Sequence, residues 1–338
     1  MEITACFCAV AAAVYVLALT RWLNSGGSAG LQLAGTCGSF GSFLYFTLDP
    51  GPCGVLLLCF SFFLIRVTKR RDELLLLPAR QLREQGRENL HVLQLDVTDS
   101  AQIEAAHRYV SAQVEDSGLW GLVNNAGVLL CPTDAELHPL TWYRRCMEVN
   151  FLSAVRMCQV FLPLLRRSRG RIVNVTSMAG EVPMPMFASY GASKAALSLF
   201  SKVMRMEMSE WGVHVALVQP SGFRTKIFGN SEDVSRNRDQ IFAAATPEAR
   251  EDYGTTYILS LPSLPFKMSQ QTSEDLSPVV EDMRHALLSV RPRLLYTPGQ
   301  MAWLLPFLRR CCPTAGFESL VWRLFRMVDL KPAGLKTS

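Results

Sequence analysis

The stretch from Ile172 to Lys202 constrains the fold of this chain more than any other. It opens with the apolar run Ile172-Val173-Asn174-Val175, continues through Ser177, and contains the sequence Tyr190-Gly191-Ala192-Ser193-Lys194. The apolar run predicts a buried strand. Tyr190 and Lys194 are four residues apart, so on a helix they share one face. A hydroxyl that follows a parallel strand lies where open α/β sheets bind ligands. The stretch therefore predicts an α/β fold with a site at this strand-to-helix connection.

The tyrosine and lysine also form a chemical pair. An ammonium group beside a phenol favours the phenolate, so we expect Lys194 to lower the pKa of Tyr190. A tyrosine with a lowered pKa can act as an acid and base near neutral pH. Two further features accompany the pair: the turn Asn124-Asn125-Ala126-Gly127 after the apolar run Leu119 to Val123, and Asn150 on the apolar face of a long helix.

Together these residues resemble the short-chain dehydrogenase/reductase family, whose catalytic set is Asn, Ser, Tyr and Lys. The matching residues are Asn150, Ser177, Tyr190 and Lys194. The resemblance implies that Tyr190 is the general base and that Ser177 polarises the substrate oxygen. It implies that Lys194 lowers the Tyr190 pKa and holds the ribose, and that Asn150 positions a water of the proton relay. An amide buried in a helix costs free energy unless it is hydrogen-bonded, and this role would explain that cost.

The fold class that the resemblance implies is α/β, with a Rossmann-like, doubly wound parallel sheet. Strands are predicted at His91 to Leu95, 119–123, 171–176, 213–218 and 294–296, and helices at about 100–116, 139–167 and 188–211. Residues 226–280 are less periodic and are predicted to cover the substrate. The tail from 301 to 328 suggests a pair of helices, either at a membrane surface or substrate channel or packed in the core.

The resemblance implies NAD as cofactor, with NADP left open. Asp96 and Val97 would lie at the adenine, although an aspartate that caps the next helix is the alternative, and Asp99 suits that role better. Asn124 could equally stabilise the sheet. The predicted cofactor-binding residues are Asp96, Val97, Asn124, Ala126, Gly127, Tyr190, Lys194, Pro220, Gly222 and Thr225.

The glycine-rich turn that should hold the cofactor phosphates is not found in the sequence. In the family it reads Thr-Gly-x-x-x-Gly-x-Gly and follows the first, central strand, next to the strand that carries Asn-Asn-Ala-Gly. Gly35, Gly38 and Gly41 have the wrong spacing and are followed by Asp49-Pro50 rather than a helix. The sheet is therefore predicted to be incomplete at its first β-α-β unit. Either the chain is a variant reading of a gene whose full product has the unit, or an apolar segment such as 54–60 replaces the strand.

The first 71 residues are predicted to anchor the chain in a membrane by helices. Residues 3–20 carry no charge, a second uncharged stretch covers about 28–48, and the apolar run 54–65 ends in a cluster of four basic residues, Arg66, Lys69, Arg70 and Arg71. Such a cluster stays on the cytosolic side. We thus expect three regions: an anchor at 1–71, a truncated catalytic domain at 72–300 and an apolar, basic tail at 301–338. The resemblance implies the endoplasmic reticulum membrane, with a cytosolic catalytic domain.

Within the family, the resemblance is strongest to membrane-bound 17-beta-hydroxysteroid dehydrogenases, which implies oxidation of a 17-beta-hydroxysteroid to the 17-ketone. A retinol dehydrogenase is the alternative substrate class, and an inactive binding protein is the alternative if the missing turn prevents cofactor binding. The net charge of +5, without a basic and aromatic stripe, argues against nucleic acid. The sequence has no Cys-x-x-Cys pair with histidines at ligand spacing, so it predicts no metal site. The family also implies a possible homodimer through the helices around residues 150 and 200.

Overall fold

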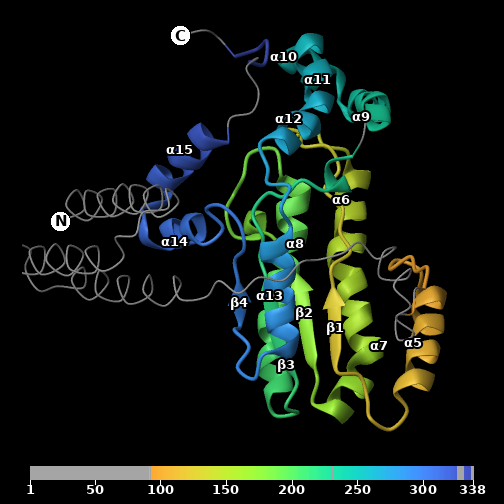
Figure 1. Ribbon diagram of the computed structural model, residues 1–338. Coiled ribbons are helices and arrows are strands. Elements are labelled where there is room, and N and C mark those ends of the chain that lie inside the picture. Colours follow the sequence, from red (N-terminus) through yellow and green to blue (C-terminus); the bar gives the residue numbers. More distant parts are fainter. Residues whose placement is uncertain (1–90, 92, 230, 326–330, 336–338) are drawn as a thin grey trace, which may run out of the picture. The chain divides into compact units, whose positions relative to one another are not determined.

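The computed structural model describes residues 91, 93–229, 231–325 and 331–335, all within the second of two units of the chain, Leu76–Ser338. These residues form a sheet of four parallel strands in the order β1 (Gly121–Asn124), β2 (Arg171–Val175), β3 (His214–Val218) and β4 (Leu295–Tyr296) (Figure 1). Asn124 pairs with Asn174, and Val175 pairs with Val218. The predicted α/β class and these four strands are confirmed.

Helices cover both faces of the sheet. On one face, α7 (Ser153–Ser168) and α8 (Ala188–Ser209) pack on the strands, and on the other lies α13 (Ser277–Leu288). The first core contains Leu122, Phe161, Ile172, Met204 and Val215. The second contains Val173, Ala216, Val218, Ala286 and Tyr296. Neighbouring residues of β2 and β3 thus enter opposite cores, as the alternation of a strand requires.

The strand predicted at His91 to Leu95 is wrong. His91 and residues 93–95 have no strand pairing, and Leu93 is 46% exposed. In the part of the chain that the structure describes, β1 pairs with β2 alone. Backbone groups in an isolated extended segment gain no ladder hydrogen bonds. Among the described residues no strand lies beside the segment around Leu93, so this segment has no partner there with which to form a sheet.

The long helix predicted at 139–167 is divided by a π-helical turn. Helix α6 (Leu140–Met147) leads into η1 (Glu148–Leu152), which leads into α7. Of the described helices, this continuous stretch, Leu140–Ser168, is the one that is long and apolar enough to cross a membrane. Its α7 portion packs on β1 and β2 and on α5 (Ser100–Val114), which makes it a core helix of the domain. The anchor predicted at 1–71 lies outside the described residues.

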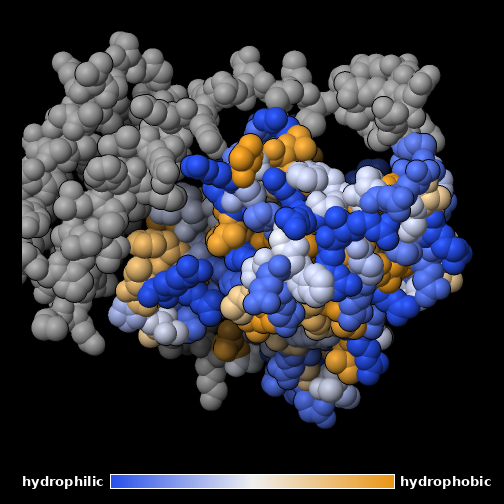
Figure 2. Space-filling model, turned by 90° about the horizontal axis from the view of Figure 1, so that it is seen from below, coloured by the Kyte–Doolittle hydropathy of each residue, from blue (hydrophilic) through white to orange (hydrophobic). Residues whose placement is uncertain are grey.

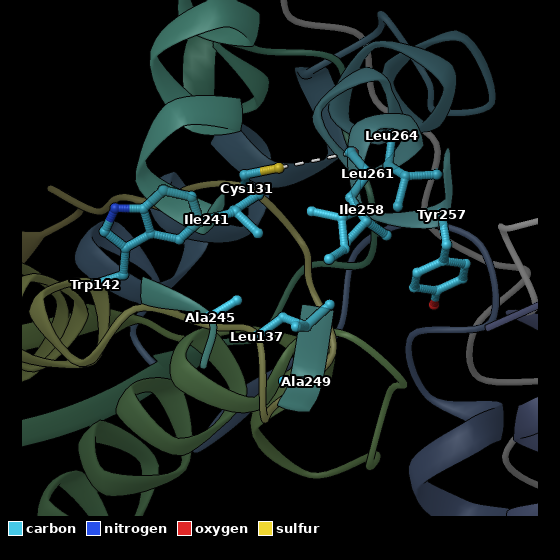
Figure 3. Packing of buried hydrophobic residues seen from close by; sticks show 10 residues of the cluster. All are labelled: Cys131, Leu137, Trp142, Ile241, Ala245, Ala249, Tyr257, Ile258, Leu261 and Leu264. Atoms are coloured by element: carbon cyan, nitrogen blue, oxygen red, sulfur yellow. Dashed lines mark hydrogen bonds between the residues drawn. The ribbon is translucent and has the colours of Figure 1, made fainter. Parts of the chain in front are cut away.

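Residues 226–280 fold mostly into short helices. These are η3 (Lys226–Phe228), α9 (Ser231–Ala244), α10 (Pro247–Tyr253), α11 (Thr255–Ser260), η4 (Leu261–Ser263) and α12 (Leu264–Gln270). Helices α9 to α12 lie beyond the carboxyl ends of the strands in Figure 1. Their buried residues form a cluster with the segment from Cys131 to Trp142, which runs into α6, and Ile241, Ile258 and Leu261 pack there against Leu137 and Trp142 (Figure 3).

Polar contacts fix the same helices to that segment. The Trp142 indole donates to Gln240 Oε1 at 2.7 Å, and the Tyr257 hydroxyl donates to Asp134 Oδ2 at 2.7 Å. Cys131 Sγ donates to the Leu261 carbonyl at 3.7 Å, the dashed contact of Figure 3. The cover of the strand ends is therefore attached through its own apolar core and a polar rim.

The predicted helix pair of the tail is present as α14 (Leu304–Cys311) and α15 (Thr314–Leu324). Its apolar residues pack against Met178 and Val182, which follow β2. Glu181 adds an ion pair to Arg310 at 3.0 Å and accepts a hydrogen bond on its carbonyl from Arg309. These contacts support the core-packing alternative for the tail.

Two exposed tryptophans lie at the amino-terminal ends of the strands. Trp120 and Trp211 are 50% and 54% exposed, and the guanidinium groups of Arg171 and Arg166 lie 5.1 and 4.8 Å from their ring centroids. Seen from below, the domain shows hydrophobic residues scattered among hydrophilic ones (Figure 2). In such cation–π contacts a guanidinium group lies over the face of an aromatic ring. The two arginines therefore cover part of each exposed indole ring.

Candidate active site

Ser177, Tyr190 and Lys194 meet at the carboxyl end of β2. Ser177 begins the short helix η2 (Met178–Gly180), where its Oγ accepts a hydrogen bond from the Ala179 amide at 3.2 Å. Tyr190 and Lys194 lie in the first two turns of α8, and a hydrogen bond joins the Ser177 and Tyr190 side chains. The three residues that the sequence singled out thus form one constellation, at the edge of the sheet where α/β folds bind ligands.

Two glycines bring η2 and α8 close enough for this contact. A Cβ atom on Gly180 would lie 2.8 Å from the Lys194 carbonyl carbon, and one on Gly191 would lie 2.9 Å from the Ala179 oxygen. Both distances are shorter than real Cβ contacts, so only glycine allows the backbones to approach this far. Sequence reasoning missed Gly180, whose only signal is its place three residues after Ser177.

Replacing Gly180 by alanine is expected to push η2 away from α8 and separate Ser177 from Tyr190. Misplacing a catalytic group by about 1 Å can cost up to about 100-fold in rate, and we expect a fall of about tenfold in kcat/KM. Steady-state kinetics on the purified variant measure the effect. Gly316→Ala is the control, because a Cβ there meets nothing within 4 Å. Equal kinetics for the two variants would contradict the role of Gly180.

Burial sets the pKa values of the catalytic pair. It raises the pKa of Tyr190 to about 12, against a smaller lowering effect of the hydrogen bond with Ser177. It also lowers the pKa of Lys194 to about 8. The prediction that Lys194 lowers the Tyr190 pKa is therefore wrong for this arrangement. The Lys194 ammonium donates to the Val175 carbonyl at 2.9 Å and lies 5.8 Å from the Tyr190 ring centroid.

The lowered pKa of Lys194 predicts a pH-dependent stability. Between pH 8 and its unfolded pKa near 10.5, the unfolded chain binds more protons at this residue than the folded one, so stability rises with pH. The raised Tyr190 pKa opposes this above pH 10. Lys194→Met should abolish the rise between pH 8 and 10, worth roughly 2 kcal/mol, while Lys202→Met, an exposed control, should retain it. Urea unfolding across this range measures both, and an unchanged slope in Lys194→Met would refute the assignment.

Asn150 lies in the π-helical turn η1, where its buried amide is hydrogen-bonded through both its oxygen and its nitrogen. Its Oδ1 accepts from the Val128 amide at 2.8 Å, and its Nδ2 donates to the Val128 carbonyl and to Ser193 Oγ, both at 2.9 Å. A Cβ on Gly127 would lie 3.3 Å from Lys194 Nζ and 3.4 Å from Asn150 Oδ1. The structure therefore brings Asn150, Lys194 and the Asn-Asn-Ala-Gly turn together. π-turns within α-helices often mark functional sites. The relay water assigned to Asn150 remains a prediction.

The other predicted cofactor residues fall into two groups. Asn124 donates from Nδ2 to Asn174 Oδ1 at 2.8 Å and so links β1 to β2, which supports its structural alternative. Ala126 and Gly222 are exposed in their turns, the Pro220 carbonyl accepts from the Met178 amide at 3.0 Å, and Thr225 caps η3 through the Ile227 amide at 3.3 Å. These turns follow β1 and β3, on either side of β2 and Ser177.

Asp96 and Val97 lie in the turn before α5. The Asp96 carboxylate accepts from the Thr98 amide at 2.9 Å and from its hydroxyl at 2.7 Å, and these bonds lower the pKa of Asp96. Asp99 caps α5 by accepting from the Ala101 and Gln102 amides. The capping role predicted for Asp99 is confirmed. Asp96 is exposed, and its side chain is hydrogen-bonded to Thr98 of the same turn. That Asp96 contacts the adenine of the cofactor remains a prediction.

The described residues fit one half of a dinucleotide. Exposed turns at Ala126 and Gly222 lie at the carboxyl edge of the sheet, on either side of the strand end that carries Ser177, where α/β sheets bind ligands and a nicotinamide riboside could lie. Among residues 93–229 and 231–325, no glycine-rich turn leads from a strand to a helix N-terminus, the arrangement that holds a pyrophosphate. The nicotinamide half therefore fits, and the phosphate half has no site in this part of the chain.

The chain matches the family model of the short chain dehydrogenases over residues 62–235. It is 43% identical to human 17-beta-hydroxysteroid dehydrogenase type 2 over 76% of this chain and 67% of that protein. It is 40% identical to sheep 11-beta-hydroxysteroid dehydrogenase type 2 over 70% and 55%, and 35% identical to human retinol dehydrogenase 16 over 72% and 76%. It thus spans about half to three quarters of the length of these relatives.

A solved structure agrees on the fold. The short-chain dehydrogenase from Streptomyces avermitilis aligns with 74% of this chain and 85% of its own, with a TM-score of 0.53 and 24% identity. At this identity the likeness shows the fold alone. The sequence match, by contrast, covers more than half of the chain and includes Asn150, Ser177, Tyr190 and Lys194. The chain therefore belongs to the short-chain dehydrogenase family of NAD(P)-dependent oxidoreductases and is similar, within it, to the hydroxysteroid dehydrogenases.

Proposed function

We propose that the protein oxidises a 17-beta-hydroxysteroid to the 17-ketone with NAD. The observation that carries the proposal is the constellation of Ser177, Tyr190 and Lys194 at the carboxyl end of β2. The surroundings of Tyr190 suit an apolar substrate, since the ring packs with Leu129, Phe187 and Met268. The 43% identity to the human type 2 17-beta enzyme supports the steroid class.

In this mechanism Tyr190 takes the proton of the substrate hydroxyl while Ser177 donates a hydrogen bond to the same oxygen. Lys194 holds the ribose. Asn150 positions the water through which the proton leaves. Bound NAD would supply the acceptor for the hydride that leaves the carbinol carbon. Because burial holds the proton on Tyr190 at neutral pH, we expect the oxidation rate to rise with pH.

Cofactor binding separates an enzyme from an inactive relative. The purified full chain in detergent is titrated with NAD and with NADP, with quenching of tryptophan fluorescence as the readout and the human type 2 17-beta enzyme as positive control. Saturable binding between about micromolar and millimolar cofactor supports the proposal. No binding to this chain, with binding to the control, would leave the inactive alternative.

Turnover then identifies the substrate class. Estradiol, an 11-beta-hydroxysteroid and retinol are compared by kcat/KM, because relatives at 43%, 40% and 35% identity are named for these three classes. The proposal expects the highest value for estradiol. Retinol dehydrogenation is the second candidate, and a higher kcat/KM for retinol would replace the steroid assignment.

We also propose that the chain is anchored in the endoplasmic reticulum membrane with its catalytic domain in the cytosol. The support is the sequence: uncharged or apolar stretches at 3–20 and 54–65, the second followed by four basic residues within 66–71. Alkaline extraction of microsomes tests the anchor, and protease protection tests the orientation. Release of the chain by alkali would exclude it.

A homodimer through α8 is a further part of the proposal. Leu199, Val203 and Met206 share one face of this helix and are 65%, 40% and 69% exposed. A contiguous exposed apolar stripe favours association with another protein surface. We expect Met206→Glu to convert a dimer into a monomer in light scattering of the detergent complex. A wild-type monomer would refute the interface.

A further inference from the structure

Two buried polar side chains on facing surfaces of β3 and α8 lack hydrogen-bond partners among the described residues. Gln219 is 1% exposed, and neither its Oε1 nor its Nε2 has a partner. Ser198 is 3% exposed, and its Oγ has none. Buried polar atoms in native proteins are nearly always satisfied by protein or by ordered water, so each exception requires an explanation.

The strand pattern directs Gln219 toward α8. The Gln219 amide donates to the Tyr296 carbonyl at 2.8 Å, so the ladder of β3 continues to this residue. Side chains of a strand alternate between its faces. Val215 packs in the core under α8, with Met204, whereas Val218 packs in the core under α13. Gln219 therefore shares the α8 face with Val215.

The helix places Ser198 at the same level. Ser201 of α8 accepts a hydrogen bond from Asn174 at 2.7 Å, and Asn174 pairs with Leu217. Ser198 lies three helix residues from Ser201, about 4.5 Å along the axis, and Gln219 lies two strand residues from Leu217, about 6.6 Å. Both displacements run toward the carboxyl edge of the sheet, because Lys194 of α8 reaches the Val175 carbonyl there.

We infer that Gln219 and Ser198 bind ordered water buried between β3 and α8. The Gln219 amide offers two donors and an acceptor, and the Ser198 hydroxyl offers one donor and acceptor sites. They are not hydrogen-bonded to each other, and a buried water needs two to four such groups. Thr176, 2% exposed, lies beside Gln219 because its amide donates to the Val218 carbonyl at 2.8 Å. This site supports the ends of the strands that carry Ser177 and Pro220. It does not depend on the steroid assignment.

A double-mutant cycle on the full chain in detergent tests the site. Gln219→Met removes the amide at nearly constant volume, Ser198→Ala removes the hydroxyl, and the third variant combines them. The control cycle pairs Gln240→Met with Ser201→Ala, two residues whose side chains have direct protein partners and lie on different elements. Urea unfolding, followed by tryptophan fluorescence, gives the unfolding equilibrium constant of every protein.

If a shared water joins the two side chains, each single variant lowers the urea midpoint and the second substitution costs less than it does alone. Multiplying the effects of the two single variants gives the unfolding equilibrium constant expected for independent sites. The measured constant of the double variant should be about fivefold smaller than this product, whereas the control cycle should be additive. Additive effects at Gln219 and Ser198 would overturn the inference. So would a higher midpoint in Gln219→Met, because a dry, unsatisfied amide is better replaced by an apolar group.

Discussion

Tyr190→Phe is expected to lower kcat for estradiol oxidation by about 10²- to 10⁴-fold, the usual contribution of a positioned acid or base. Phenylalanine keeps the ring that packs with Leu129, Phe187 and Met268 but cannot take a proton. The hydrogen bond with Ser177 is lost as well, so stability should change by no more than about 1 kcal/mol. Initial rates with saturating steroid and NAD, together with urea unfolding, measure the two effects separately.

The matched control is Tyr109→Phe. It removes the same atom from a half-buried side chain, whose hydroxyl bonds to His91 Nδ1, and we expect wild-type kcat. A Tyr190→Phe protein that keeps full turnover would refute the assignment of Tyr190. A loss of turnover with an equal loss in Tyr109→Phe would point to a general effect on folding instead.

Asn150→Ala is expected to destabilise the domain by about 3 to 5 kcal/mol, because it removes three hydrogen bonds from a buried site. The Val128 amide and carbonyl lose their partner, and an unpaired buried backbone group costs about 1–3 kcal/mol. A whole domain is stable by only about 5–15 kcal/mol. The variant should therefore unfold at a much lower urea concentration.

Asn125→Ala is the control for this prediction. Asn125 is an exposed amide in the turn that precedes Val128, and its loss should change stability by less than about 0.5 kcal/mol. Similar midpoints for Asn150→Ala and wild type would mean that the π-helical turn does not depend on the bonds to Val128. Asn150→Asp, which keeps an acceptor but loses the donors, should be intermediate.

Local patterns in the sequence predicted the catalytic part of the structure well. β2 and α8 followed from an apolar run and from helical spacing, and the structure brings Ser177, Tyr190 and Lys194 together as expected. The cap of α5 by Asp99 was also predictable, since an N-cap depends on a few neighbouring residues. These features are short in sequence, so a single sequence contains most of what determines them.

Features that depend on distant partners were not predictable in the same way. The segment around Leu93 has the pattern of a strand, but a strand forms only beside another. The pKa of Tyr190 was expected to fall because of Lys194, yet burial by several elements raises it. Gln219 gave no signal at all, because its missing partners are visible only once α8 covers β3. The helices in 226–280 are short and owe their stability to the shared cluster around Ile258.

The predicted catalytic residues Ser177, Tyr190 and Lys194 lie within one continuous strand–turn–helix segment, from Arg171 to Ser209. Contacts within such a segment close only short loops and therefore cost little chain entropy. The turns that are predicted to bind the cofactor, by contrast, come from separate parts of the chain. We therefore expect β2 and α8 to become protected from amide hydrogen exchange early in refolding, before the turn at Gly127 does. The chemistry of the site would then be assembled before the surface that binds its cofactor.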